Sequence, residues 1–279
     1  MNAGATALAL CLCLALAVLP AAGREIEGAA LDRLPAAEIT LLGEIHDNPQ
    51  HHLNQARAVA AILPRALVFE MLPEGVAPDP AAGRDAAALA AAIGWNGRGW
   101  PDFALYAPIF AAAPQARIYG AELPRPEVRR AIGDGAAAVF GPRAARFGLT
   151  EPLPEALLQD ALDEQFAAHC GAMPREALSG MVEAQRLRDA ALARAALRAL
   201  EETGGPVAVI AGAGHVRRDR GLPFVLAAAA PGVTVLAVGQ GESAESADST
   251  AAPADLPFDL WLLTPPAPRE DPCAAFSGG

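Results

Sequence analysis

Short runs of apolar, largely β-branched residues alternate along this chain with longer stretches rich in Ala, Leu and Arg. Runs of this kind are typical of strands, and six are predicted at residues 39–43, 66–71, 116–120, 207–211, 233–238 and 258–263. Because nearly every position in these runs is apolar, helices should cover both faces of the sheet. The pattern predicts an α/β fold with a mostly parallel sheet flanked by helices.

A helical insertion is predicted between the third and fourth of these strands. Apolar residues recur at helical spacing over residues 124–140, 154–169 and 175–201. In the last of these stretches the apolar face is interrupted by Gln185 and Asp189. Two loops, residues 72–84 and 240–257, are predicted from their Pro, Gly, Ser and acidic content.

Residues 1–23 have the features of a secretory signal peptide. They carry no charged side chain, contain an apolar run and end in small residues, which predicts a mature domain of residues 24–279 in the periplasm or secreted. The usual basic residue at the start is missing, so an uncleaved membrane anchor stays an alternative. A lipid anchor is less favoured, because Cys11 and Cys13 lie inside the apolar run.

The net charge argues against one class of partner, and the cysteine content predicts a disulfide. The net charge is −11, and all 21 basic residues are Arg. Nucleic acid is not expected as a partner, because phosphate binding requires an excess of positive charge. Cys170 and Cys273 are the two cysteines of the mature chain, and in an exported protein they predict a disulfide. Two unpaired thiols are the alternative.

Polar residues follow the first predicted strand at once, in the sequence LLGEIHDNPQHH from residue 41 to residue 52. Alternation along a strand places Glu44 and His46 on the same side. Asn48 and Pro49 are a typical helix cap and first helical residue, so His51 and the following His lie in the first turn. Taken alone, these two histidines fit equally well as surface residues of a helix start.

The same arrangement recurs at two other strands. Glu70 ends the second predicted strand, and His215 follows the fourth after a glycine turn. A dinucleotide site is rejected, because the third glycine of its fingerprint would fall on Arg217. If these strands are neighbours in a parallel sheet, Glu44, His46, Glu70 and His215 converge. They suit a divalent metal ion or a general base, and a hydrogen-bonded network without metal is the alternative.

Five segments, taken together and in order, resemble the ChaN-like haem-binding proteins of the Tiki superfamily. They are residues 43–49 (GEIHDNP), 68–71 (VFEM), 94–106 (with Trp95, Trp100 and Tyr106), 185–189 and 212–217 (GAGHVR). The resemblance implies an exported protein of iron or haem uptake that binds haem and forms a homodimer around stacked haems. It also implies a distant relation to metal-dependent peptidases and esterase-like enzymes. A haem or iron transporter is the partner that uptake suggests.

Haem requires an axial ligand and an apolar slot. Tyr106, in an apolar aromatic segment, is preferred as the ligand to Tyr119, which ends a strand. His51 is a second candidate, because it faces the same rim as His46. The resemblance also places three residues of the long helix in the strand-end pocket, as ligand-contacting or supporting groups: Gln185, Arg188 and Asp189.

Three functions remain open from the sequence. The preferred one is an exported haem-binding protein. The alternative is a metal-dependent hydrolase, peptidase-like or esterase-like, in which Glu44, His46, Glu70 and His215 act as catalytic residues and metal ligands. The third is a scaffold that binds neither. Neither an H-E-x-x-H nor a G-x-S-x-G motif occurs, so the standard zinc-protease and serine-hydrolase mechanisms have no support in the sequence.

Overall fold

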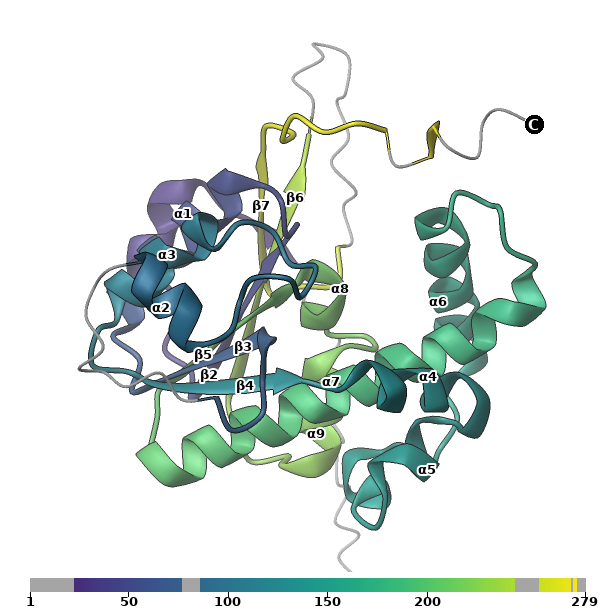
Figure 1. Cartoon of the computed structure of the whole chain (residues 1–279). Coiled ribbons are helices and arrows are strands. Elements are labelled where there is room, and N and C mark those ends of the chain that lie inside the picture. Colours follow the sequence, from purple (N-terminus) through teal and green to yellow (C-terminus); the bar gives the residue numbers. More distant parts are fainter. Residues whose placement is uncertain (1–22, 77–85, 244–255, 272, 275–279) are drawn as a thin grey trace, which may run out of the picture.

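A computed structural model describes residues 23–76, 86–243, 256–271, 273 and 274 of the chain. Seven parallel strands form one sheet in the order β1-β7-β6-β2-β5-β3-β4 (Figure 1). The strands are β1 (Arg24–Glu25), β2 (Ile39–Glu44), β3 (Ala66–Pro73), β4 (Arg117–Glu122), β5 (Val207–Gly212), β6 (Val235–Glu242) and β7 (Leu260–Thr264). The predicted α/β fold with a mostly parallel sheet is confirmed.

Helices cover both faces of the sheet, as the apolar strands require. One face packs against η1 (Gly28–Arg33), α1 (Pro49–Ile62), α2 (Ala86–Ala92) and α3 (Phe103–Ala112). The other face packs against α7 (Arg175–Thr203) and α9 (Leu222–Ala229) (Figure 1). Two hydrophobic clusters therefore lie on opposite sides of one sheet, and every residue of β2 and β5 is buried between them.

The predicted helical insertion is confirmed between β4 and β5. It contains α4 (Arg125–Asp134), α5 (Ala136–Phe140), η2 (Ala144–Phe147), α6 (Glu155–Ala168) and α7. The helix predicted over residues 124–140 is two helices, because Gly135 between them adopts a φ of 83°, which ends the first one. Figure 1 shows α6 standing away from the sheet.

The two predicted loops begin later than expected. Residues 240–242 continue β6, where Gly241 pairs with Leu263 of β7, and residues 72 and 73 continue β3. Strand pairing supplies these backbone groups with partners that a local pattern cannot reveal. Residues 77–84 and 244–255 of the predicted loops, and residues 1–22 of the predicted signal peptide, lie outside the described ranges.

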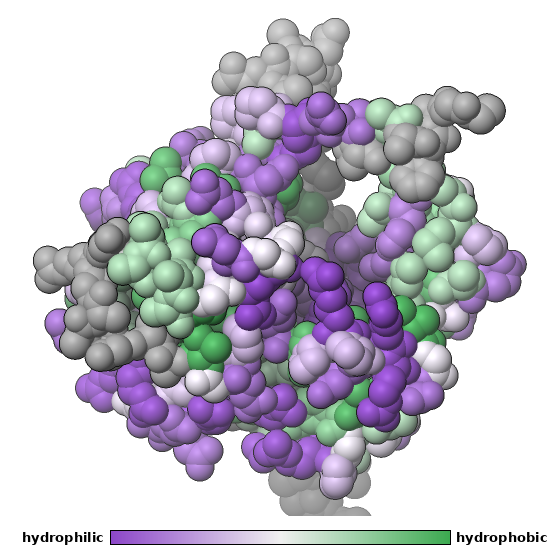
Figure 2. Space-filling view, viewed as in Figure 1, coloured by the Kyte–Doolittle hydropathy of each residue, from purple (hydrophilic) through white to green (hydrophobic). Residues whose placement is uncertain are grey.

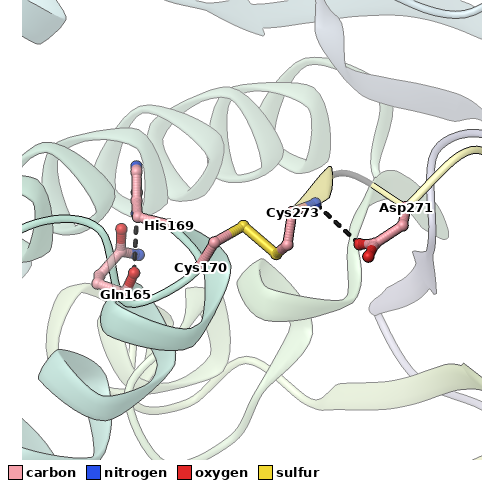
Figure 3. Close-up of a disulfide and its surroundings, with 5 residues drawn as sticks. All are labelled: Gln165, His169, Cys170, Asp271 and Cys273. Atoms are coloured by element: carbon pink, nitrogen blue, oxygen red, sulfur yellow. Dashed lines mark hydrogen bonds between the residues drawn. A yellow bond between two sulfur atoms is a disulfide. The ribbon is translucent and has the colours of Figure 1, made fainter. Parts of the chain in front are cut away.

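The predicted disulfide joins two distant parts of the fold. Cys170, just after α6, is bonded to Cys273 near the carboxyl end of the chain, with an S–S distance of 2.06 Å (Figure 3). Arg269 anchors the same C-terminal segment through ion pairs with Asp47 and Glu242. Among the described helices, none is long and apolar enough to span a membrane.

Candidate functional site

The carboxyl ends of three adjacent strands form the site. Because β5 lies between β2 and β3, Glu44 at the end of β2 is in register with Gly212 at the end of β5, and Glu70 of β3 approaches from the other side. A Cβ atom on Gly212 would lie 3.1 Å from His46 Nε2 and 3.6 Å from Glu70 Oε2. Glycine here leaves room for both side chains, and the predicted convergence of the strand ends is confirmed.

Glu44 is the centre of one half of the site. Its carboxylate is buried and receives a hydrogen bond from His46 Nδ1 at 2.7 Å and another from the Tyr106 hydroxyl at 2.8 Å. Its second oxygen lies 3.3 Å from His52 Nδ1. These three contacts hold a charged group inside an apolar core, where an unpaired carboxylate would be strongly unfavourable.

Glu70 and His215 form the other half. His215 belongs to a short helix, α8 (Ala213–Val216), where a glycine turn was predicted. Its Nε2 lies 3.3 Å from Glu70 Oε1, and its Nδ1 donates a hydrogen bond of 2.7 Å to Asp189 of α7. The backbone N–H of Gly212 donates to Glu70 Oε2 at 2.8 Å. His215 thus lies between two carboxylates, and its single positive charge is shared by both.

The ionisation of these groups follows from burial opposed by pairing. Burial would raise the pKa of Glu44, but its contacts with His46 and His52 outweigh burial and bring it to about 2. Burial would likewise raise the pKa of Glu70, which the charge of His215 lowers to about 2. For His215, burial is outweighed by the charges of Glu70 and Asp189, so its pKa rises to about 10. At neutral pH, Glu44 and Glu70 are therefore carboxylates and His215 is an imidazolium.

His46 differs from the other site histidines in being open to solvent. Its side chain is 33% exposed, and Nδ1 is bonded to Glu44. Nε2 lies 3.9 Å from Glu70 Oε2 and makes no hydrogen bond within the described part of the chain. The Trp100 ring lies edge-on to the imidazole, with 5.1 Å between centroids. A fixed ring orientation with an open Nε2 is the arrangement found in metal-ligating histidines.

The first turn of α1 begins as predicted, with the Asn48 side chain accepting a hydrogen bond from the Gln50 N–H. His51 and His52, however, are fully buried and not surface residues. His51 Nδ1 accepts from the Ile45 N–H at 2.8 Å, and its Nε2 lies 2.9 Å from the Thr264 hydroxyl of β7. Both ring nitrogens of His51 therefore have partners in the core.

The remaining predicted site residues lie on α3 and α7. The Tyr106 side chain is fully buried, and burial together with Glu44 raises the pKa of its hydroxyl. Gln185 Nε2 lies 3.0 Å from His215 Nδ1, so Gln185 and Asp189 both contact the same imidazole. Arg188, one residue before Asp189, is exposed and faces a cavity beside Glu70.

The four residues predicted as metal ligands contact one another in pairs of a carboxylate and an imidazole. Within the described ranges, no group of three or more His, Cys, Asp or Glu side chains is arranged to hold a metal ion. Glu44, His46, Glu70 and His215 instead face one another as acid–imidazole pairs. These contacts join the four side chains in one network, and their role as metal ligands stays a prediction.

A cavity of 230 Å³ adjoins the network and contains residues that were not predicted. Trp100 and Glu70 border it on the side of His46, and Arg98, Glu122 and Arg125 line it further out. Figure 2 shows hydrophilic side chains, in purple, around a hollow between the sheet and the helices α4 and α6. Glu122 lies two residues beyond the third predicted strand, so the strand-end rule that found Glu70 applies to it as well, whereas Arg125 begins α4.

Comparisons with known proteins agree with this architecture. The fold is similar to a solved structure of ChaN from Campylobacter jejuni with cofacial haem binding, at 18% identity and a TM-score of 0.59, over 80% of this chain and 86% of that one. The type III effector HopBA1 is 14% identical over 82% and 88% of the two chains, with a TM-score of 0.43, too low to support an argument. No curated protein matches the sequence.

A family profile decides the assignment. The profile described as haem-binding uptake, Tiki superfamily, ChaN matches residues 30–226, which is more than half of the chain and includes Glu44, His46, Glu70 and His215. The protein therefore belongs to the ChaN-like haem-binding uptake family of the Tiki superfamily.

Proposed function

We propose that this protein binds haem at the carboxyl ends of β2, β3 and β5 and serves the uptake of iron or haem. The observation that carries the proposal is the geometry of His46. Glu44 holds Nδ1, Nε2 is open, and the ring is exposed beside Trp100 and a cavity. An imidazole held in this way can supply the axial ligand, and the indole and the apolar residues of the cavity can contact the porphyrin.

Tyr106 and His51 fit the role of axial ligand less well than His46. The Tyr106 hydroxyl is buried and donates to Glu44, and both ring nitrogens of His51 have partners in the core. Either residue would have to leave these partners before it reached an iron atom, and each buried group left unpaired costs roughly 1–3 kcal/mol. We therefore infer that Tyr106 and His51 stabilise the site from the protein core and do not contact the iron.

Haemin titration of the purified protein should give a saturable shift of the Soret band, and the affinity should increase with pH. Burial would lower the pKa of His46, but Glu44 and Glu70 outweigh it and raise the pKa above its usual 6.5. A ligating imidazole must lose its proton, so binding strengthens as pH rises through that raised pKa. Titrations from pH 6 to pH 9 measure this.

Protoporphyrin IX is the control for this titration, because it has the same ring without iron. Its affinity should not increase with pH in parallel with that of haemin. Absence of a saturable Soret shift at any of these pH values would contradict haem binding. A shift with parallel pH profiles for the two porphyrins would contradict only the role of His46.

We further propose that a second copy of the chain covers the exposed face of the bound haem. The adjoining cavity, at 230 Å³, is smaller than the roughly 300–1,000 Å³ of pockets that enclose a whole ligand. A macrocycle on His46 therefore keeps much of its surface outside the cavity, and a homodimer would bury it. Haemin added at one equivalent should shift the protein from monomer to dimer in light scattering after size exclusion.

Export is part of the proposal and rests on residues 1–23 together with the Cys170–Cys273 disulfide, which is typical of oxidising compartments. A membrane transporter that accepts the haem is the partner that uptake requires. Expression of the full chain in a Gram-negative host should yield a periplasmic protein that begins near Arg24. After denaturation it should contain no free thiol. A chain that retains Cys11 and Cys13 would contradict cleavage and leave two thiols to react.

A further inference from the structure

The cavity beside Glu70 has an apolar floor and a basic wall. Ala121 belongs to β4 and Leu123 directly follows it, while Val128 belongs to α4 and Leu192 to α7. Three arginines from different parts of the chain line the same space: Arg98, Arg125 and Arg188. Since α7 packs against both α4 and β4, Arg125 of α4 and Arg188 of α7 are positioned by packed helices.

The positive charge of this wall is only partly neutralised. Arg98 forms an ion pair with Glu122. Arg125 donates through Nη2 to the backbone oxygen of Arg98 at 3.0 Å, and none of the acidic side chains that the structure describes forms an ion pair with it. Arg188 has no hydrogen bond or ion pair to any described residue. Glu70, the other acid of the lining, is already paired with His215.

A ligand that fits this cavity has an anionic arm attached to a larger apolar body. The volume of 230 Å³ accommodates a side arm more readily than a whole macrocycle. Guanidinium groups bind carboxylates in bidentate geometry. Trp100 contacts the ring of His46 and also lines the cavity, so the two places are adjacent.

We propose that this cavity binds the carboxylate arms of haem, its propionates, with Arg125 and Arg188 as the contacting groups and Arg98 as the residue that positions Arg125. This inference rests on the proposed function, because it requires haem at His46. It assigns the orientation of the porphyrin: the propionate edge points toward α4 and α7, and the opposite edge points toward solvent or a second copy of the chain.

The test compares haemin with haemin dimethyl ester, in which both propionates are neutral. The unaltered protein should bind haemin about tenfold more tightly than the ester. A tenfold difference in affinity corresponds to the contribution of about one charge-assisted hydrogen bond. In the variant Arg125→Gln/Arg188→Gln the affinity for haemin should fall about tenfold, while the affinity for the ester stays unchanged. Arg129→Gln is the matched control, since Arg129 is exposed on α4 and does not line the cavity.

The outcomes separate the two proposals. If neither porphyrin binds, the proposed function fails. If both bind with equal affinity, or if the double variant weakens haemin and ester alike, haem binding stands and the propionate assignment is wrong. Circular dichroism and urea unfolding of the double variant show whether it is folded. Should it not be, the single variant Arg188→Gln, which breaks no described contact, decides the question with the same pair of ligands.

Discussion

The variant His46→Ala should bind haemin on the order of 100-fold more weakly than the unaltered protein. Loss of a residue that only supports a metal ligand typically weakens metal binding by about 10- to 100-fold, and loss of the ligand itself should reach the upper end of that range. The reason is that His46 presents an open Nε2, while the other histidines of the site use their nitrogens inside the protein. The loss should be confined to iron porphyrins, since protoporphyrin IX has no metal to ligate. Soret titrations of both compounds measure it.

The matched control is His169→Ala. His169 is also a partly exposed histidine, but it lies at the end of α6 next to the disulfide (Figure 3). This variant should bind haemin as the unaltered protein does. If His46→Ala retains haemin affinity within about threefold, which is less than 1 kcal/mol, His46 is not the ligand. Tyr106→Phe then becomes the informative variant, because a change in the absorption spectrum of its haemin complex would show that a tyrosinate ligand has been lost.

The variant Glu44→Ala should lower the free energy of unfolding by about 3–5 kcal/mol, as is usual when one partner of a buried ion pair is removed. Glu44 is 2% exposed and serves three groups at once. Without it, the Tyr106 hydroxyl and His46 Nδ1 lose their hydrogen-bond acceptor, and the buried His52 loses the carboxylate oxygen that lies 3.3 Å from its Nδ1. Urea unfolding at pH 7 measures the change.

Glu74→Ala is the control for this stability loss. Glu74 pairs with Arg194 and Arg198 on the surface, where its side chain is 53% exposed. Exposed ion pairs contribute only about 0–1 kcal/mol, so the two variants should differ by at least 2 kcal/mol or so. Equal effects would mean that the network around Glu44 does not depend on its charge.

These two variants separate two roles within one cluster. Glu44, His52 and Tyr106 are buried and fix the imidazole of His46 in place. His46 and the arginines of the cavity lie at the surface, where a ligand can reach them. A buried network that orients one exposed donor is a rigid basis for binding, because the ligand does not have to order the donor when it arrives.

Most of the strand-end site was predictable because its signal is local. A carboxylate or imidazole directly after an apolar run is visible in the residue order, as with Glu44, His46, Glu70 and His215. The helix start at Asn48 and Pro49 is equally local, since a cap bonds to the backbone two residues later. The helix boundaries within the insertion were harder to predict, because a single glycine, Gly135, divides the first predicted helix into two.

The roles of the individual side chains were not predictable in the same way. His51 and His46 are five residues apart and chemically identical, yet Thr264 of β7 and the backbone of Ile45 occupy the nitrogens of His51. Tyr106 belongs to an apolar segment that suits a haem slot, but α3 directs its hydroxyl inward to Glu44. In each case the partner comes from another element of the fold.

The sequence predicted the α/β class, the parallel sheet, the helical insertion and the four residues that meet at the strand ends, and it favoured a disulfide between Cys170 and Cys273 over two unpaired thiols. These depend on periodicity, composition and the position of polar residues next to apolar runs. Tertiary structure alone decided which of those residues stays open to a ligand. It also brought Arg98, Arg125 and Arg188 around one cavity. The exposure of a side chain and the convergence of distant residues depend on strand order and helix packing. Neither can be inferred from the spacing of residues along the chain.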